Sequence, residues 1–268
     1  MTTEQGLLRT SLRFAWNALN ENGLLRASVL GTILCITLFS IALAAFGVTY
    51  TLGAKGGPQA YSPRLFALLF LPAEFLIYDL ILGNPAPRAA LKDLYLDLRF
   101  LWLLWTLALL YLGLALPVVA AGFVNAFLVG FLKTRSGGAF LGIGLLVVCD
   151  LILAVALAGL VVRFFYLPVI VSQRGPKPLA TTYRETKGKA WRISCALFLP
   201  YLAIFAVSLP MELLGPVLER NLGFVGLAPW FLLDALMTGF FCCVSAAVLA
   251  FSYQRAVRGT DPGETATA

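Results

Sequence analysis

Charged residues are scarce in this chain, and histidine is missing. Only 12% of its 268 residues are Asp, Glu, Lys or Arg, and 60% are hydrophobic, whereas about a quarter of an average soluble domain is charged. Histidine is the commonest general base and metal ligand in proteins, and the chain has none. With so few charges the chain cannot cover a water-facing surface. The composition therefore excludes an ordinary soluble protein.

Paired cysteines and catalytic motifs are lacking as well. The five cysteines lie inside apolar runs without the spacing of metal ligands: Cys35, Cys149, Cys195, Cys242 and Cys243. Neither a Gly-x-Ser-x-Gly motif nor a phosphate-binding loop occurs. We therefore expect no metal site, no disulfide framework, no cofactor and no catalytic residue, and hence a protein that is not an enzyme.

What the chain does have is six long apolar runs. A helix needs about 20 apolar residues to cross roughly 30 Å of hydrocarbon, and the runs cover residues 27–50, 65–82, 100–122, 139–162, 193–214 and 227–253. The second run is the shortest, and the third can extend towards Leu132 with a bend at Pro117. We predict an all-α polytopic membrane protein with one integral domain, residues 1–258, and a disordered tail, residues 259–268.

Basic residues favour one orientation of these runs. If all six cross the membrane, fifteen of the twenty Lys and Arg residues lie on the side of the N-terminus. Because such residues concentrate on the cytoplasmic side, we expect both termini in the cytoplasm. If residues 65–82 lie on the surface instead, and the N-terminus is outside, fourteen basic residues lie inside and six lie outside. The net charge of +7 is thus an orientation signal, and we expect no nucleic-acid binding.

A short amphipathic stretch precedes each odd-numbered run. Before the first run an apolar stripe faces away from a polar one (Leu8, Leu12, Ala15 and Leu19 against Arg9, Arg13, Asn17 and Asn20). Residues 87–98 and 178–188 precede the third and fifth runs; both begin with proline, and the second ends with glycine. Such residues are typical helix boundaries. We predict three repeats of one unit, an interfacial amphipathic helix followed by a transmembrane hairpin.

Four acids lie inside the predicted spans, all on the even-numbered runs: Glu74, Asp79, Asp150 and Asp234. Acids in hydrocarbon are costly and mark either a functional path or a buried partner. They would form a path for protons or a cation if their helices faced one cavity. The alternative is that each acid is satisfied separately, Asp79 by an ion pair with Arg163 at similar depth and Asp234 by water near the outer surface.

Cations and tryptophans mark the ends of the spans. Six basic residues precede the fifth run and form a basic connector: Arg174, Lys177, Arg184, Lys187, Lys189 and Arg192. At the inner leaflet each gains about 1 kcal/mol near anionic lipid, so the connector is either an orientation signal alone or a site for lipid headgroups. Four tryptophans fit an interfacial belt better than a cofactor site: Trp102, Trp105, Trp191 and Trp230.

The basic connector also carries a resemblance to a known family. The run RFFYLPVIV at 163–171, followed by QRGPKPLATTYRETKGKAWRI at 173–193, resembles the membrane domain of some bacterial glycerophosphoryl diester phosphodiesterases and of stand-alone relatives without the catalytic domain. The positions that carry the motif are Thr182, Tyr183, Thr186, Lys187, Gly188, Trp191 and Arg192. Residues 14–26 and 247–259 are similar to the family as well. The resemblance implies an α-helical inner-membrane protein and carries over no catalytic residue.

Two functional hypotheses follow from these features. We expect an integral inner-membrane protein, non-catalytic and associated with the envelope or with lipid. Its partners are then membrane lipids, and another membrane protein or a second copy of itself. The alternative is a proton- or ion-coupled transporter or channel that uses the intramembrane carboxylates. A hydrated cavity reaching Asp150 favours the transporter, and a packed and paired Asp150 favours the scaffold.

Overall fold

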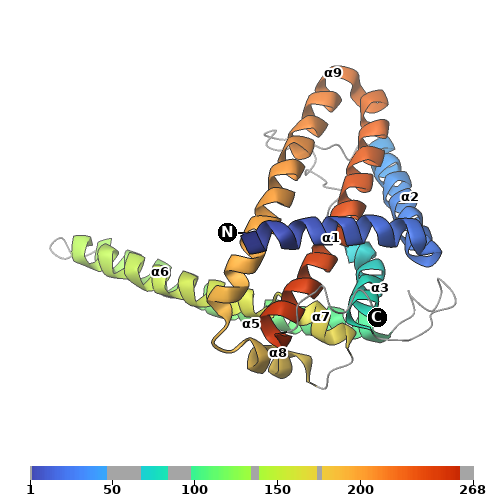
Figure 1. Cartoon of the computed structure of the whole chain (residues 1–268). Coiled ribbons are helices and arrows are strands. Elements are labelled where there is room, and N and C mark those ends of the chain that lie inside the picture. Colours follow the sequence, from blue (N-terminus) through green and yellow to red (C-terminus); the bar gives the residue numbers. More distant parts are fainter. Residues whose placement is uncertain (1, 47–67, 84–97, 134–138, 174–176, 260–268) are drawn as a thin grey trace. The chain divides into compact units, whose positions relative to one another are not determined.

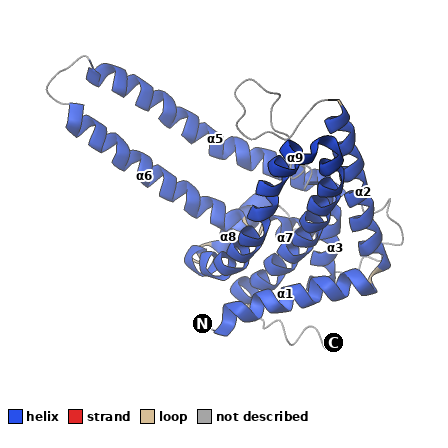
Figure 2. Cartoon of the chain, turned by 90° about the horizontal axis from the view of Figure 1, so that it is seen from above, coloured by secondary structure: helices blue, strands red, loops and turns tan. Residues whose placement is uncertain are grey.

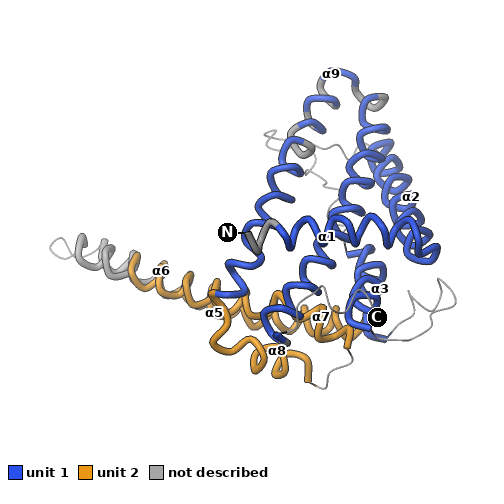
Figure 3. The backbone as a smooth tube through the Cα atoms, in the orientation of Figure 1, with its two compact units in different colours: residues 1–100, 192–268 blue, residues 101–191 orange. Residues whose placement is uncertain are grey.

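The structure is a computed structural model that describes residues 2–46, 68–83, 98–133, 139–173 and 177–259. In this part of the chain every element is helical and no strand occurs (Figure 2). The chain forms two compact units, Met1–Phe100 with Arg192–Ala268, and Leu101–Trp191 (Figure 3). We describe each unit by itself.

Within the described residues, five helical segments are long and apolar enough to cross a membrane: Gly23–Ala45, Leu98–Ala126, Val147–Ser172, Ala190–Pro210 and Gly226–Val257. Their mean hydropathy lies between 2.0 and 2.4, and each has at least the length that a spanning helix needs. The predicted helical, membrane-embedded class is therefore confirmed.

The second predicted run is the one that these five segments omit. Its described part is residues 68–82, of which Leu71–Leu82 form α3. Twelve residues span about 18 Å at the helical rise of 1.5 Å per residue, which is too short to cross the hydrocarbon. Residues 47–67 lie outside the described residues, as do 84–97 with the second predicted interfacial helix. Six crossings in three hairpins therefore stay a prediction.

The first unit contains α1 (Thr2–Glu21), α2 (Gly23–Ala45), α3, α9 (Ala190–Tyr253) and a short π-helix (Gln254–Arg258). In Figure 1, α9 rises as one arm, turns over and returns as a second arm. The turn lies between the two candidate spans Ala190–Pro210 and Gly226–Val257, where the sequence has Gly215, Pro216 and Gly223. Glycine and proline are the weakest helix formers, which favours a turn in this stretch.

Helix α1 crosses the arms of α9 and contacts α2 (Figure 1). Its buried residues are Leu7, Ser11, Ala15 and Ala18. Of the predicted apolar stripe, Ala15 is buried and Leu12 is 37% exposed, and the stripe as an interfacial surface stays a prediction. Small side chains allow two helices to approach closely, so the face with Ser11 and the two alanines packs against the unit, and Leu12 turns outward.

The second unit contains most of α5 (Leu98–Lys133), with α6 (Ala139–Phe164), α7 (Leu167–Ser172) and α8 (Pro178–Thr186). Helix α5 continues through Pro117 to Lys133, as the sequence allowed. Helix α8 begins at the expected proline, and Gly188 follows it with φ +76°. Only glycine adopts this conformation routinely, so the predicted helix boundary is confirmed.

Candidate functional site

The strongest polar contact in the first unit joins α3 to the start of α5. Arg99 donates from Nη1 to Asp79 Oδ1 at 3.0 Å and from Nη2 to Oδ2 at 3.1 Å. Both side chains are buried, and the guanidinium carbon lies 5.7 Å from the centre of the Phe75 ring. Gln254 adds a bond from Nε2 to the Ile81 carbonyl oxygen, 3.1 Å long. The end of α3 is thereby fixed to the start of α5 and to the π-helix.

The sequence predicted Arg163 as the partner of Asp79, but the structure gives Arg99. That prediction rested only on the similar depth expected for the two residues in the membrane. The Arg163 guanidinium instead lies 5.0 Å from the centre of the Tyr183 ring of α8, a cation–π contact inside the second unit. The expected ion pair between Asp79 and Arg163 is therefore replaced by two separate contacts.

Glu74 lies in a different polar cluster between α3 and α9. The Tyr78 hydroxyl donates to Glu74 Oε2 over 3.5 Å, and the Cys242 thiol hydrogen-bonds to the same carboxyl group. Tyr201 lies near Tyr78, and its hydroxyl is 2.7 Å from that of Ser245. The cluster gathers polar groups from α3 and from both arms of α9. Glu74 and Asp79 thus have separate partners, as expected for residues about 140° apart on a helix.

The other two acids differ in their surroundings. Asp150 of α6 is exposed and accepts from Asn125 Nδ2 of α5 with both carboxylate oxygens, at 2.9 and 2.8 Å. Asp234 of α9 is 2% exposed and interacts within the chain. We had expected surface water to satisfy Asp234, and its burial contradicts that expectation. Asp150 is thus paired but not packed within the second unit.

The basic connector is largely on the surface where it is described. Lys177, Arg184, Lys187 and Arg192 are exposed, Lys189 is half-buried, and Arg174 lies outside the described residues. The buried face of α8 is Pro178, Thr182 and Thr186. Each threonine hydroxyl donates to a carbonyl one turn earlier, at 2.7 Å. Because these hydroxyls are satisfied inside the helix, α8 can bury its threonines and keep its cations outside.

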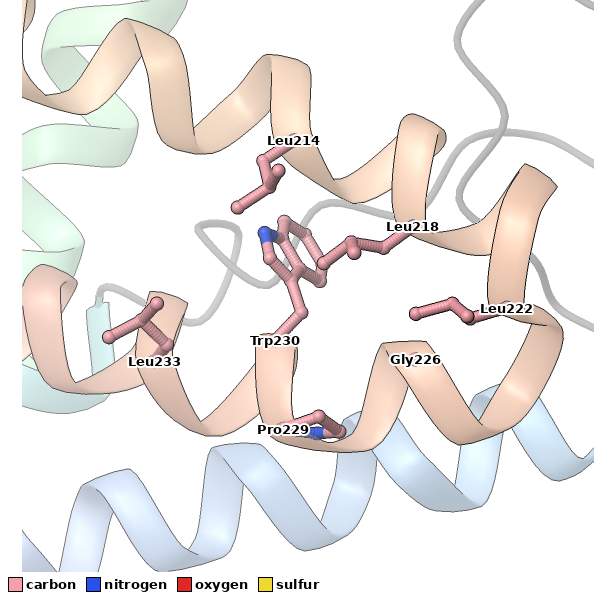
Figure 4. A pocket seen from close by; sticks show the side chains of 7 residues that line it. All are labelled: Leu214, Leu218, Leu222, Gly226, Pro229, Trp230 and Leu233. Atoms are coloured by element: carbon pink, nitrogen blue, oxygen red, sulfur yellow. The ribbon is translucent and has the colours of Figure 1, made fainter.

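An apolar pocket lies between the two arms of α9, near the turn (Figure 4). We call it the α9 pocket. It is lined by Leu214, Leu218, Leu222, Gly226, Pro229, Trp230 and Leu233, and its volume is about 310 Å³. The Trp230 ring lies between the arms and is 2% exposed, unlike Trp102, Trp105 and Trp191, which are 48%, 59% and 80% exposed. Trp230 therefore departs from the predicted interfacial belt.

Sequence reasoning missed the α9 pocket and the Glu74 cluster. The pocket depends on Gly215, because a Cβ atom there would lie 2.7 Å from Trp230 Cζ2. In the sequence the only sign is a glycine 15 residues before a tryptophan, and this spacing has no helical period. Tyr201 and Ser245 lie 44 residues apart, and the folding back of α9 alone brings them together.

Comparison with family models, with curated proteins and with solved structures gives no match to this chain. Among the described residues no group of three or more Cys, Asp or Glu side chains is placed to hold a metal ion.

Proposed function

We propose that this chain is a non-catalytic inner-membrane protein that associates with anionic lipid through its basic connector. The observation that carries the proposal is the arrangement of α8, which buries its threonines and leaves Arg184 exposed, with Lys177 and Lys187 exposed at its two ends. Basic residues near an anionic leaflet gain about 1 kcal/mol each. The resemblance of residues 163–193 to the membrane domain of glycerophosphoryl diester phosphodiesterases supports the same proposal.

The proposed topology places both termini and the basic connector in the cytoplasm, with six crossings as three hairpins. Supporting it are the excess of Lys and Arg on that side and the crosswise position of α1 on its unit (Figure 1). The exposed Asn125–Asp150 pair supports a partner inside the membrane, a second copy or another membrane protein, since polar groups in hydrocarbon favour protein neighbours.

The test reverses charge in the basic connector. The variant Lys187→Glu/Lys189→Glu, purified from native membranes, should retain fewer anionic lipids, measured by mass spectrometry against a zwitterionic lipid. Loss of two cations near the membrane surface removes about 2 kcal/mol of binding free energy, which lowers the affinity for anionic lipid about thirtyfold. The control is Lys55→Glu/Arg64→Glu, which makes the same charge change on the predicted outer side. Equal retention by the two variants, with topology unchanged, would refute headgroup binding.

A second candidate function is proton- or ion-coupled transport through the intramembrane carboxylates. The Glu74 cluster favours it, since an acid, two tyrosines, a thiol and a serine hydroxyl gather between α3 and the two arms of α9. Intramembrane acids with such neighbours occur in proton relays. Against it stands the pairing of each acid with a partner of its own, Asp79 with Arg99 and Asp150 with Asn125.

A further inference from the structure

The α9 pocket is lined in part by a candidate span. Gly226, Trp230 and Leu233 belong to the segment Gly226–Val257, which is long and apolar enough to cross a membrane. In the proposed topology this segment crosses the membrane, so the pocket borders lipid chains on the side of this arm and not bulk water.

We propose that the α9 pocket binds one hydrocarbon chain of a membrane phospholipid. Among the residues that the structure describes, no charged side chain lines the pocket, and its lining consists of leucine, glycine, proline and tryptophan. Such a surface offers van der Waals contact and little else, so it favours an apolar occupant. The lipid hydrocarbon next to the arms is the apolar molecule present at the highest concentration.

The size of the pocket fits one chain and not a whole lipid. Its volume of about 310 Å³ is at the lower limit of ligand pockets, which hold roughly 300–1,000 Å³. It corresponds to roughly ten volumes of 30 Å³, the share of one water in the liquid and close to that of one methylene group. A segment of about ten methylenes therefore fills it, with the headgroup outside.

The pocket is held open by packing behind it. Leu227, Trp230 and Phe231 are each 2% exposed and form a core cluster with Ile41 and Ala44 of α2. The Trp230 ring lies against the backbone of Gly215, where no Cβ atom fits without a shift. Because the ring is fixed from both sides, the arms cannot close over the pocket without displacing this cluster. A preformed pocket binds a chain without the cost of rearrangement.

This inference deepens the proposed function, since it rests on the association with lipid and adds a site for the chain. Lys187 and Lys189 of the basic connector lie in the second unit, the pocket lies in the first, and the two sites share no residue. A variant of one site should therefore leave binding at the other unchanged.

The test uses the full chain reconstituted in vesicles of a diacyl phospholipid that carries a photoactivatable diazirine in one chain. After illumination, mass spectrometry locates the labelled residues. We expect labelling between Leu214 and Leu233 to exceed labelling at Leu202 and Phe205, which are exposed on the first arm of α9. Uniform labelling of exposed apolar residues would overturn the proposal, and a crosslink to a second copy would assign the pocket to self-association instead.

Filling the pocket gives the sharper comparison. Leu218→Trp places a ring in the cavity and should lower pocket labelling about tenfold, or about 1.4 kcal/mol. The matched control Leu202→Trp adds the same ring at an exposed position of the same arm and should change nothing. Leu222 is 60% exposed at the pocket edge, so Leu222→Trp blocks entry without crowding the core if Leu218→Trp does not fold.

The outcomes separate the two proposals. Full labelling in both pocket variants would refute the chain site while leaving headgroup retention through Lys187 and Lys189 intact. Loss of headgroup retention in the charge-reversed variant, with pocket labelling unchanged, is the expected result for two independent sites. If reversal of Lys187 and Lys189 leaves retention unchanged but pocket labelling persists, the proposed function fails and the pocket stands.

Discussion

Arg99 binds both carboxylate oxygens of Asp79, at 3.0 and 3.1 Å, across 20 residues of sequence and with both side chains buried. Such a bidentate pair fixes orientation as well as distance. Removal of one partner from a buried pair leaves an uncompensated charge, which costs more than removal of both. The pair therefore holds α3 against the start of α5.

Arg99→Met should destabilise the protein by about 3–5 kcal/mol, because Asp79 then remains buried without its partner. The measurement is thermal unfolding in detergent. The double variant Asp79→Leu/Arg99→Met should recover much of this loss. The control Arg192→Met removes an exposed arginine and should change stability by less than about 0.5 kcal/mol. Equal midpoints for Arg99→Met and the wild type would contradict the role of the pair.

Ala15→Arg should disrupt the packing of α1, whereas Leu12→Arg should be tolerated. Ala15 is fully buried and Leu12 is 37% exposed, so only the first variant forces a charge into a packed face. The thermal midpoint of the purified protein measures the difference. The opposite order would contradict the burial of Ala15 against the unit. Phe14 packs edge-on against Phe251, with ring centres 5.5 Å apart, so loss of α1 packing should also loosen the end of α9.

Gly188→Ala should destabilise the turn after α8 by about 1–2 kcal/mol, the cost of a left-handed conformation for an L-residue. No heavy atom lies within 4 Å of the added Cβ, and φ is +76°. The backbone alone therefore opposes the change. Gly188→Asn should cost less, since asparagine adopts this conformation more readily. Gly159→Ala, within α6 and also without neighbours, is the control and should be neutral or stabilising.

Asp150→Asn should leave proton flux unchanged if the protein is not a transporter. The new amide oxygen can still accept from Asn125, which now donates to both carboxylate oxygens. The measurement is the pH change inside proteoliposomes with a trapped dye, between pH 5 and pH 8. Glu74→Gln is the companion variant for the second cluster. A wild-type flux that either substitution abolishes would establish the transporter and exclude the scaffold.

Reporters fused at each terminus should both report the cytoplasm. This follows from the proposed six crossings and from the positive residues on that side. An N-terminus outside the cell would show that residues 65–82 do not cross. It would leave the side of the basic connector unchanged, since fourteen basic residues still lie inside in that arrangement.

Local features of the sequence predicted local features of the structure. The apolar runs gave the helical membrane class, because a helix is the simplest way to satisfy every backbone group in hydrocarbon. Pro178 predicted the beginning of α8, because proline restricts the backbone at its own position. Gly188 predicted the turn after α8, because glycine permits backbone angles that other residues avoid. Neither inference requires knowledge of what lies beside the helix.

Contacts between distant helices were not predictable in the same way. Arg163 was expected at the same depth as Asp79, yet Asp79 binds Arg99, because depth does not determine which way a helix face points. On α1, the apolar side chains alone do not show that Ser11, Ala15 and Ala18 face the unit. Both contacts depend on the rotation of a helix about its axis.

The amino-acid order alone determined that this chain is a helical membrane protein and which segments carry its basic residues. Both features depend on composition within single segments. Which side chains meet was decided only when α9 folded back on itself and the glycine at position 215 admitted the Trp230 ring. That contact depends on the distance between two backbones, a quantity that no single segment of sequence contains.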